Sequence, residues 1–155
     1  MTQEIWKQQQ IINWSQLLLN SYEKFLRHQL IERKGSREEQ AQALFFAPVV
    51  VVSHGTEADP IFNYANQTAL KLWEMNWEEF TQMPSRQSAE ISIQEERKQL
   101  LEQAGQQNFI DNYRGVRIGS TGKRFLIEKA IVWNLVNIES KYCGQAATFS
   151  QWSFL

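Results

Sequence analysis

A short run of polar side chains is the part of this sequence best suited to binding chemistry. It contains Ser85, Arg86 and Ser88, with Glu90 just beyond them. The Arg86 guanidinium has a fork of donors that suits a carboxylate or a phosphate, and the flanking hydroxyl groups could complete an anion site. The alternative is an ion pair between Arg86 and either Glu90 or a strand carboxylate such as Asp111. We favour this pairing, because ion pairs that fix loops outnumber ligand sites.

Catalytic chemistry has weaker support. Asp111 or Glu128 could act as a general acid or base if it lay in an apolar cavity, but the sequence does not show that either does. Nucleophilic catalysis would need Cys143 beside a histidine, and the chain has only His28 and His54. We therefore expect no catalytic residues, with a small-molecule enzyme that uses a buried carboxylate as the alternative.

Two further polar clusters have simple structural interpretations. The segment 53–59 carries His54, Glu57 and Asp59, but such residues populate ordinary turns, and no second histidine lies at ligand spacing. Four basic residues are expected on a solvated hairpin that protects a sheet edge: Arg114, Arg117, Lys123 and Arg124. With a formal charge of −1, the chain has no field that would attract a polyanion. We expect no metal site and no nucleic-acid partner.

Large aromatic side chains could line a ligand cavity and stack on a planar guest. They are Phe62, Tyr64, Trp73, Trp77, Phe125 and Trp133. An aromatic residue at strand or helix spacing more often fills a core, because cores require volume. The candidate pocket set combines aromatic and polar residues: Tyr64, Trp73, Trp77, Ser85, Arg86, Asp111, Phe125 and Trp133.

A strand followed by two capped turns must position the first of these residues. Pro60 suits the start of a strand, and the β-favouring residues after it continue that strand to Tyr64. Asn66 is a suitable N-cap for a short helix that carries Trp73. Three pairs have capping-box spacing: Asn76 with Glu79, Ser36 with Glu39, and Ser92 with Glu95. The apolar run 49–52 predicts a buried first strand.

The N-terminal segment is predicted to form a long amphipathic helix from about Thr2 to Arg33, ending near Gly35. Its apolar stripe recurs every seven residues, at Ile5, Ile12, Leu19 and Leu26, with Ile11, Leu18 and Phe25 beside them. Polar residues at the intervening positions argue against a strict coiled coil, so the stripe either lies on a sheet or pairs in a dimer seam. We expect a homodimer through this helix, because an exposed stripe would aggregate.

The C-terminal half is predicted to be a sheet. Residues 109–118 and 123–135 form two long strands around a GSTG turn, and a last strand covers 142–152. Simple alternation in the second strand places Phe125, Ile127, Ile131 and Trp133 on one face, with Leu126, Ala130 and Val132 on the other. Since both faces are apolar, something must cover the outer one.

Several segments of this chain resemble the MEKHLA family, which has a PAS-like fold. They are the cassette PIFNYANQTALKLWEMNWEEF, then MPSRQSAE, FIDNYRGVRI, TGKRFLIEKAIVWNL and GQAATFSQW. The six-letter motif that names the family does not occur literally. The resemblance implies a free-standing bacterial type of domain and an α+β, PAS-like fold. Its five-stranded antiparallel sheet would carry helices on one face and the long N-terminal helix on the other.

The resemblance also implies a function. We expect an N-terminal helix over residues 1–35 and a PAS-like domain over 36–155, which binds a small organic ligand or a protein partner and signals to an unknown downstream protein. Light-oxygen-voltage photosensors need a cysteine beside the flavin, and Cys143 lies instead on the last predicted strand. Haem sensors usually take an axial histidine from the helix before the hairpin, and residues 93–107 contain none. Neither cofactor is supported.

Composition is consistent with one globular domain. The 155 residues are 43% hydrophobic and 21% charged, which is enough to bury a sizeable core. A single cysteine excludes an internal disulfide and fits a reducing compartment. No signal peptide and no apolar run of about 18 to 20 residues is apparent, so we expect a cytoplasmic protein without a membrane anchor.

Overall fold

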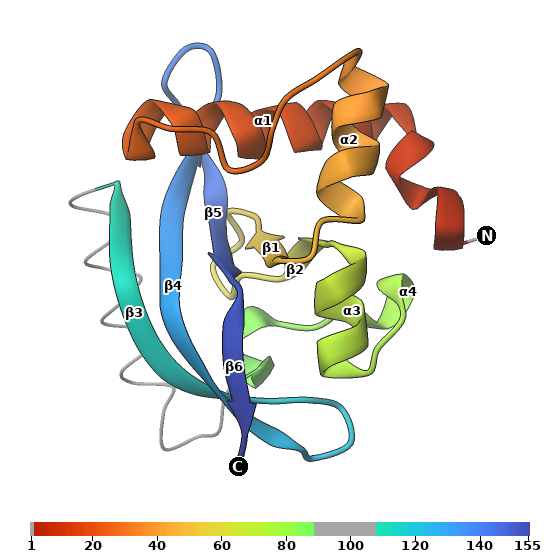
Figure 1. The fold of residues 1–155 in the computed structure, drawn as a ribbon, viewed down its shortest axis with the longest axis vertical. Helices are drawn as coiled ribbons and strands as arrows, with labels where there is room; N and C mark the ends of the chain where they lie inside the picture. The colour runs from red at the N-terminus through yellow and green to blue at the C-terminus, as the bar shows by residue number, and fades with distance from the viewer. Residues whose placement is uncertain (1, 89–107) are drawn as a thin grey trace.

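An antiparallel sheet forms the centre of the molecule, and helices pack on both of its faces (Figure 1). The computed structural model describes residues 2–88 and 108–155. The strands are β1 (Val50–His54), β2 (Phe62–Ala65), β3 (Phe109–Ile118), β4 (Arg124–Val136), β5 (Tyr142–Phe149) and β6 (Gln151–Phe154). Their order is β2-β1-β5-β4-β3, and β6 pairs with the first half of β4. The predicted α+β, PAS-like fold is confirmed; the expected last strand is divided at Ser150 into β5 and β6.

The helices are η1 (Thr2–Lys7), α1 (Gln9–Leu26), α2 (Arg37–Phe45), α3 (Gln67–Trp73), α4 (Trp77–Phe80) and η2 (Ser85–Ser88). The three caps that lie in the described residues are confirmed. Asn66 accepts from the Ala69 amide, and both capping boxes, at Ser36 and at Asn76, are complete. The predicted box at Ser92 and the helix after it lie outside the described residues.

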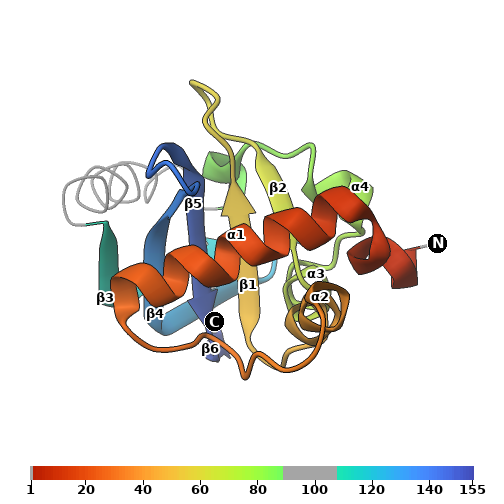
Figure 2. The same cartoon turned by 90° about the horizontal axis from the view of Figure 1, so that it is seen from above.

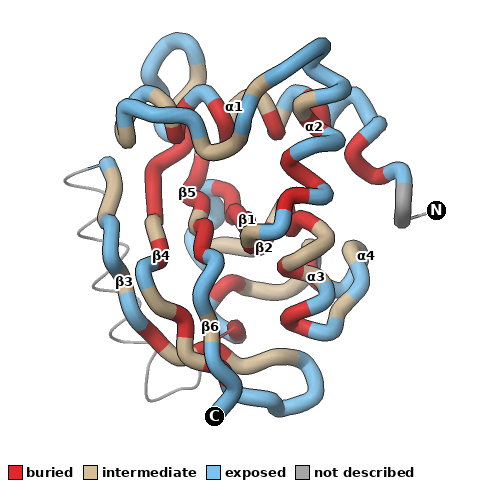
Figure 3. Tube along the Cα trace, in the orientation of Figure 1, coloured by how far each residue is buried: buried red, intermediate tan, exposed pale blue. Residues whose placement is uncertain are grey.

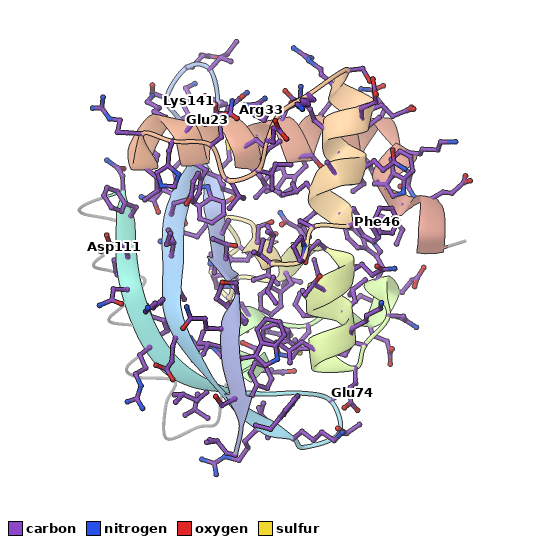
Figure 4. The ribbon with its side chains drawn as sticks, viewed as in Figure 1. Glu23, Arg33, Phe46, Glu74, Asp111 and Lys141 are labelled. Atoms are coloured by element: carbon purple, nitrogen blue, oxygen red, sulfur yellow. The ribbon has the colours of Figure 1, made fainter. Side chains whose placement is uncertain are left out.

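The N-terminal helix is shorter than the prediction at both ends, since Thr2–Lys7 form the separate 3-10 helix η1 and α1 begins only at Gln9. α1 ends at Leu26, where Arg27 adopts a left-handed conformation with φ of 67°. The chain then turns back along α1. As a result, the Arg33 side chain, which was predicted to lie in the last turn of the helix, instead contacts side chains on the surface of α1. Arg33 forms an ion pair with Glu23 and donates to Asn20 Oδ1 over 2.9 Å (Figure 4).

The apolar stripe of α1 lies on the sheet, which was one of the two predicted outcomes. Figure 2 shows α1 crossing the strands, and Ile12, Leu18 and Leu19 are buried beneath it. Leu18 and Leu19 join one apolar cluster with Val51 of β1 and Trp133 of β4. Because the stripe is covered within one chain, the exposed surface from which a dimer was inferred is not present.

Two bulges, one at Asn112 of β3 and one at Lys129 of β4, change which residues face the two sides of the sheet. At Lys129 of β4 the backbone has φ of 56°, and the register with β3 shifts by one residue there. Phe125 and Ile127 therefore share a face with Ala130, whereas Trp133 packs towards α1. The predicted grouping of Ile131 and Trp133 with Phe125 is wrong, because simple alternation does not continue through a bulge.

A second cluster fills the opposite face, between the sheet and the helices α3 and α4. Trp73, at the end of α3, makes edge-to-face contacts with three rings: Phe80, Phe125 and Phe149. The hairpin between β3 and β4 docks on the same helix end, because the Ser120 amide donates to the Trp73 carbonyl over 3.0 Å. Figure 3 shows the resulting contrast between the buried central strands and the more exposed β3. This packing fixes the walls of the cavity described next.

Candidate functional site

A small cavity lies between the sheet and the end of α3. It leaves about 60 Å³ open to the centres of water molecules. Since one water needs roughly 10–15 Å³ by this measure, the space suits several waters or one small organic molecule. Its apolar walls come from both layers: Val52, Phe62, Trp73, Ile127, Ala130, Val132, Ala147 and Phe149. Its polar lining comes mainly from the strands: Ser53, His54, Tyr113, Arg117 and Gln145, with Ser88 from η2.

Polar side chains form a row across three strands at one end of the cavity. His54 of β1 pairs with Gln145 of β5, and Gln145 pairs with Asn134 of β4. The Gln145 amide donates to Asn134 Oδ1 over 2.9 Å. His54 Nδ1 lies 2.8 Å from the Gly55 carbonyl, so this nitrogen carries the proton and Nε2 is an acceptor in the neutral ring. The row gives this end of the cavity both donors and acceptors.

Among the described residues that line the cavity, Arg117 is the one that carries a permanent charge, and it is only 7% exposed. It donates from Nη1 to the Val116 carbonyl over 2.8 Å and from Nη2 to the Tyr113 hydroxyl over 3.2 Å. Its guanidinium carbon lies 5.5 Å from the centre of the Tyr113 ring. A side chain at Gly115 would collide with the Tyr113 hydroxyl, so the glycine between them leaves room for this stack.

The burial of Arg117 corrects one prediction. Four basic residues were expected on a solvated hairpin, and three of them are indeed exposed: Arg114, Lys123 and Arg124. Arg117 instead points inwards, because Tyr113, Gly115 and Arg117 alternate on the inner face of β3. The spacing Tyr-x-Gly-x-Arg was the available signal, since it places a small residue between two large ones on one face.

Of the eight candidate pocket residues, Trp73 lines this cavity. It is 3% exposed, and its Nε1 has no hydrogen-bond partner among residues 2–88 and 108–155. Phe125 lies next to the cavity, with its ring centre 5.2 Å from that of Trp73. These two candidates are brought together by the packing of α3 on β4.

Three other aromatic candidates lie away from the cavity. Tyr64 and Trp133 belong to the cluster beneath α1, and Trp77 packs against Tyr64 with ring centres 5.7 Å apart. Trp133 Nε1 donates to the Leu18 carbonyl over 3.3 Å, which ties β4 to α1. Burial raises the pKa of the Tyr64 hydroxyl, and its neighbour Ser15 opposes this effect only in part. This face of the sheet is a core that carries α1.

The polar candidates are structural or exposed. The Ser85 amide donates to the Pro60 carbonyl over 2.8 Å. Arg86 forms the expected type of ion pair, but the carboxylate at 3.1 Å is that of Asp59 in the 53–59 segment. Asp111 lies on the exposed outer side of β3 (Figure 4). The other predicted partner, Glu90, is outside the described residues.

The groups considered for catalysis do not meet. Neither Asp111 nor Glu128 lines the cavity. Cys143 packs with the cluster beneath α1, and its thiol lies 3.4 Å from the Lys141 carbonyl. Within residues 2–88 and 108–155, no three His, Cys, Asp or Glu side chains are grouped so that they could hold a metal ion. In the same residues, no helix is long and apolar enough to cross a membrane.

Solved structures with this arrangement include PAS and light-oxygen-voltage domains. The PAS domain of a protein from Colwellia psychrerythraea has a TM-score of 0.65 and 11% identity, over 76% of this chain and 95% of that one. A light-oxygen-voltage domain studied with a flavin analogue has a TM-score of 0.60 and 13% identity, over 76% and 84%. The blue-light photoreceptor Vivid has a TM-score of 0.58 and 10% identity, over 86% and 94%. At these identities the likeness concerns the fold alone.

Comparison of the sequence itself gives the family. No curated protein matches this chain. The MEKHLA domain matches residues 12–154, which include most of α1 as well as the whole sheet. This chain therefore belongs to the MEKHLA domain family.

Proposed function

We propose that this domain is a non-catalytic sensor that binds a small organic ligand in the cavity between the sheet and α3. The observation that carries the proposal is the lining of the cavity, where apolar walls meet a small number of oriented polar groups. This combination is typical of ligand sites, since apolar surface supplies affinity and polar groups supply orientation. The proposed binding is non-covalent, because the thiol of Cys143 packs on the other face of the sheet.

Strand β4 connects the cavity to α1 on the other face of the sheet. In β4, Val132 lines the cavity while its neighbour Trp133 packs towards α1. α1 is also held by Ser21, whose hydroxyl accepts from the Val136 amide over 3.0 Å. A ligand that displaces β4 would therefore displace α1. We propose that α1 presents this change to a separate signalling protein.

The test is to look for a retained ligand and then to fill its space. Native mass spectrometry of the purified protein, with an absorbance spectrum, should show an added mass that is lost on denaturation. Ala130→Leu places a larger side chain in the cavity and should abolish this added mass while the protein remains folded. Ala43→Leu makes the same change at an exposed position of α2 and should leave it unchanged. Equal retention in both variants would refute binding in this cavity.

A further inference from the structure

The charge of Arg117 indicates what kind of ligand the cavity takes. Among residues 2–88 and 108–155, no carboxylate lies within 4.0 Å of its guanidinium, although the residue is only 7% exposed. Its two hydrogen bonds go to neutral acceptors, a carbonyl and a phenol. Neutral acceptors do not balance a buried positive charge, and such charges in proteins are normally paired.

A buried donor without a partner in the described part of the chain belongs to another residue that lines the same cavity. Trp73 lines the cavity, and its buried Nε1 has no acceptor among the described residues. An indole nitrogen can only donate, so it requires an acceptor. The contact between Ser120 and the Trp73 carbonyl holds the end of β3, and with it Arg117, against the end of α3. The cavity thus combines a buried cation with a buried neutral donor, and both call for acceptor oxygens.

We propose that the ligand is a small organic carboxylate whose oxygens accept from Arg117 and whose apolar part lies against Phe62, Val132 and Phe149. This proposal rests on the ligand-binding function proposed above. The guanidinium fork matches a carboxylate in shape and in charge. Inorganic phosphate carries more negative charge than one guanidinium balances, and it has no apolar part to fill the walls.

The experiment follows the indole resonances of the ¹⁵N-labelled full chain during titration. The chain has six tryptophans, and Trp73→Phe assigns the resonance of interest. Trp133, whose indole is bonded to Leu18, serves as an internal control for the intact fold. Benzoate, benzamide and inorganic phosphate are the three probes, because benzoate and benzamide share a shape and differ in charge.

Benzoate should shift the Trp73 indole resonance, and the titration should give it an affinity about tenfold or more above that of benzamide. Phosphate should not shift this resonance. Arg117→Gln should remove this preference, and Arg117→Lys should retain part of it because the charge remains. Arg114→Gln, an exposed change on the same strand, should behave as the unchanged protein. Stronger binding of phosphate than of benzoate would overturn the carboxylate assignment.

The remaining outcomes separate the two proposals. Equal binding of benzoate and benzamide would overturn the anion inference and leave the small-ligand function standing. Binding of benzoate that is unchanged in Arg117→Gln would overturn the role of Arg117. If no probe moves the Trp73 resonance and the purified protein also retains no ligand, both proposals fail together.

Discussion

Replacing Asn66 with alanine should be far more destabilising than the loss of an ordinary helix cap. Asn66 is 0% exposed, and its side chain makes four hydrogen bonds to backbone groups. It accepts from the amides of Ala69 and Val51, and it donates to the carbonyls of Leu44 and Val49 over 3.2 and 2.7 Å. One side chain therefore joins the start of α3, the end of α2 and the edge of β1.

The magnitude follows from these four contacts. Loss of the N-cap itself costs about 1 kcal/mol. Each of the other three backbone groups would lose its partner in or near the core, at about 1 kcal/mol each. We expect Asn66→Ala to lower the free energy of unfolding by about 3–5 kcal/mol, which is a large part of the roughly 5–15 kcal/mol typical of a domain.

Urea denaturation followed by circular dichroism and tryptophan fluorescence measures this effect. The matched control is Asn76→Ala, which removes the one bond that this exposed N-cap side chain accepts, from the Glu79 amide of α4, and should cost about 1 kcal/mol. The slope of the transition should be the same in both variants, because the surface exposed on unfolding is unchanged. If the two substitutions cost the same, Asn66 is only a cap and the reasoning is refuted.

Three further substitutions test other features. Gly144→Ala should cost about 3 kcal/mol in urea, because φ is 147° and the new Cβ would collide with the His54 carbonyl. Burial raises the pKa of Tyr64, so stability falls as the pH rises through about 10, where the unfolded chain loses the proton first. Tyr64→Phe should reduce that fall. Hydrogen bonds from Ser36, chiefly from its backbone amide, lower the pKa of Glu39, so this stabilisation is lost as the pH falls below about 4.5, and Glu39→Gln, which cannot titrate, should lose less stability there.

These predictions have specific controls. Gly122→Ala, where nothing lies within 4 Å of the new Cβ but φ is 86°, should cost only about 1 kcal/mol. If Gly144→Ala costs no more than Gly122→Ala, the collision with the His54 carbonyl is excluded. An alkaline unfolding profile that is unchanged in Tyr64→Phe would contradict the raised pKa. An acid unfolding profile that is unchanged in Glu39→Gln would contradict the lowered pKa of Glu39.

The parts of the fold that depend on local chemistry could be predicted from the sequence. Caps are local, because an Asn or Ser side chain bonds to an amide three residues ahead, and all three predicted caps in the described residues are present. The strand Phe109–Ile118 was also predicted with its observed bounds. Its composition favours extended backbone, and a glycine-containing turn ends it.

The lining of the cavity could be predicted only in part, because it depends on which strands pair with each other. The local sequence pattern does not specify this pairing. Trp73 was predicted as a pocket residue because large aromatic side chains can line a ligand cavity, and it does line the cavity. His54 and Gln145 were missed, because they become neighbours only when β1 pairs with β5. Arg117 was assigned to the surface as one of the basic residues of the hairpin, although its same-face neighbours, Tyr113 and Gly115, lie on the inner side of β3.

The bulge at Lys129 explains why this fold has a cavity at all. If β4 had kept the predicted alternation, Ile131 and Trp133 would lie on the same face as Phe125, and the indole of Trp133 would occupy the space beneath the sheet. The residue inserted at the bulge places Trp133 on the face of the sheet that carries α1. There the Trp133 Nε1 donates to the Leu18 carbonyl. The small side chain of Ala130 and that of Val132 then face the cavity instead. One irregular residue therefore both opens the cavity and anchors α1 on the sheet, so under the function proposed above a ligand in the cavity would act on α1 through β4.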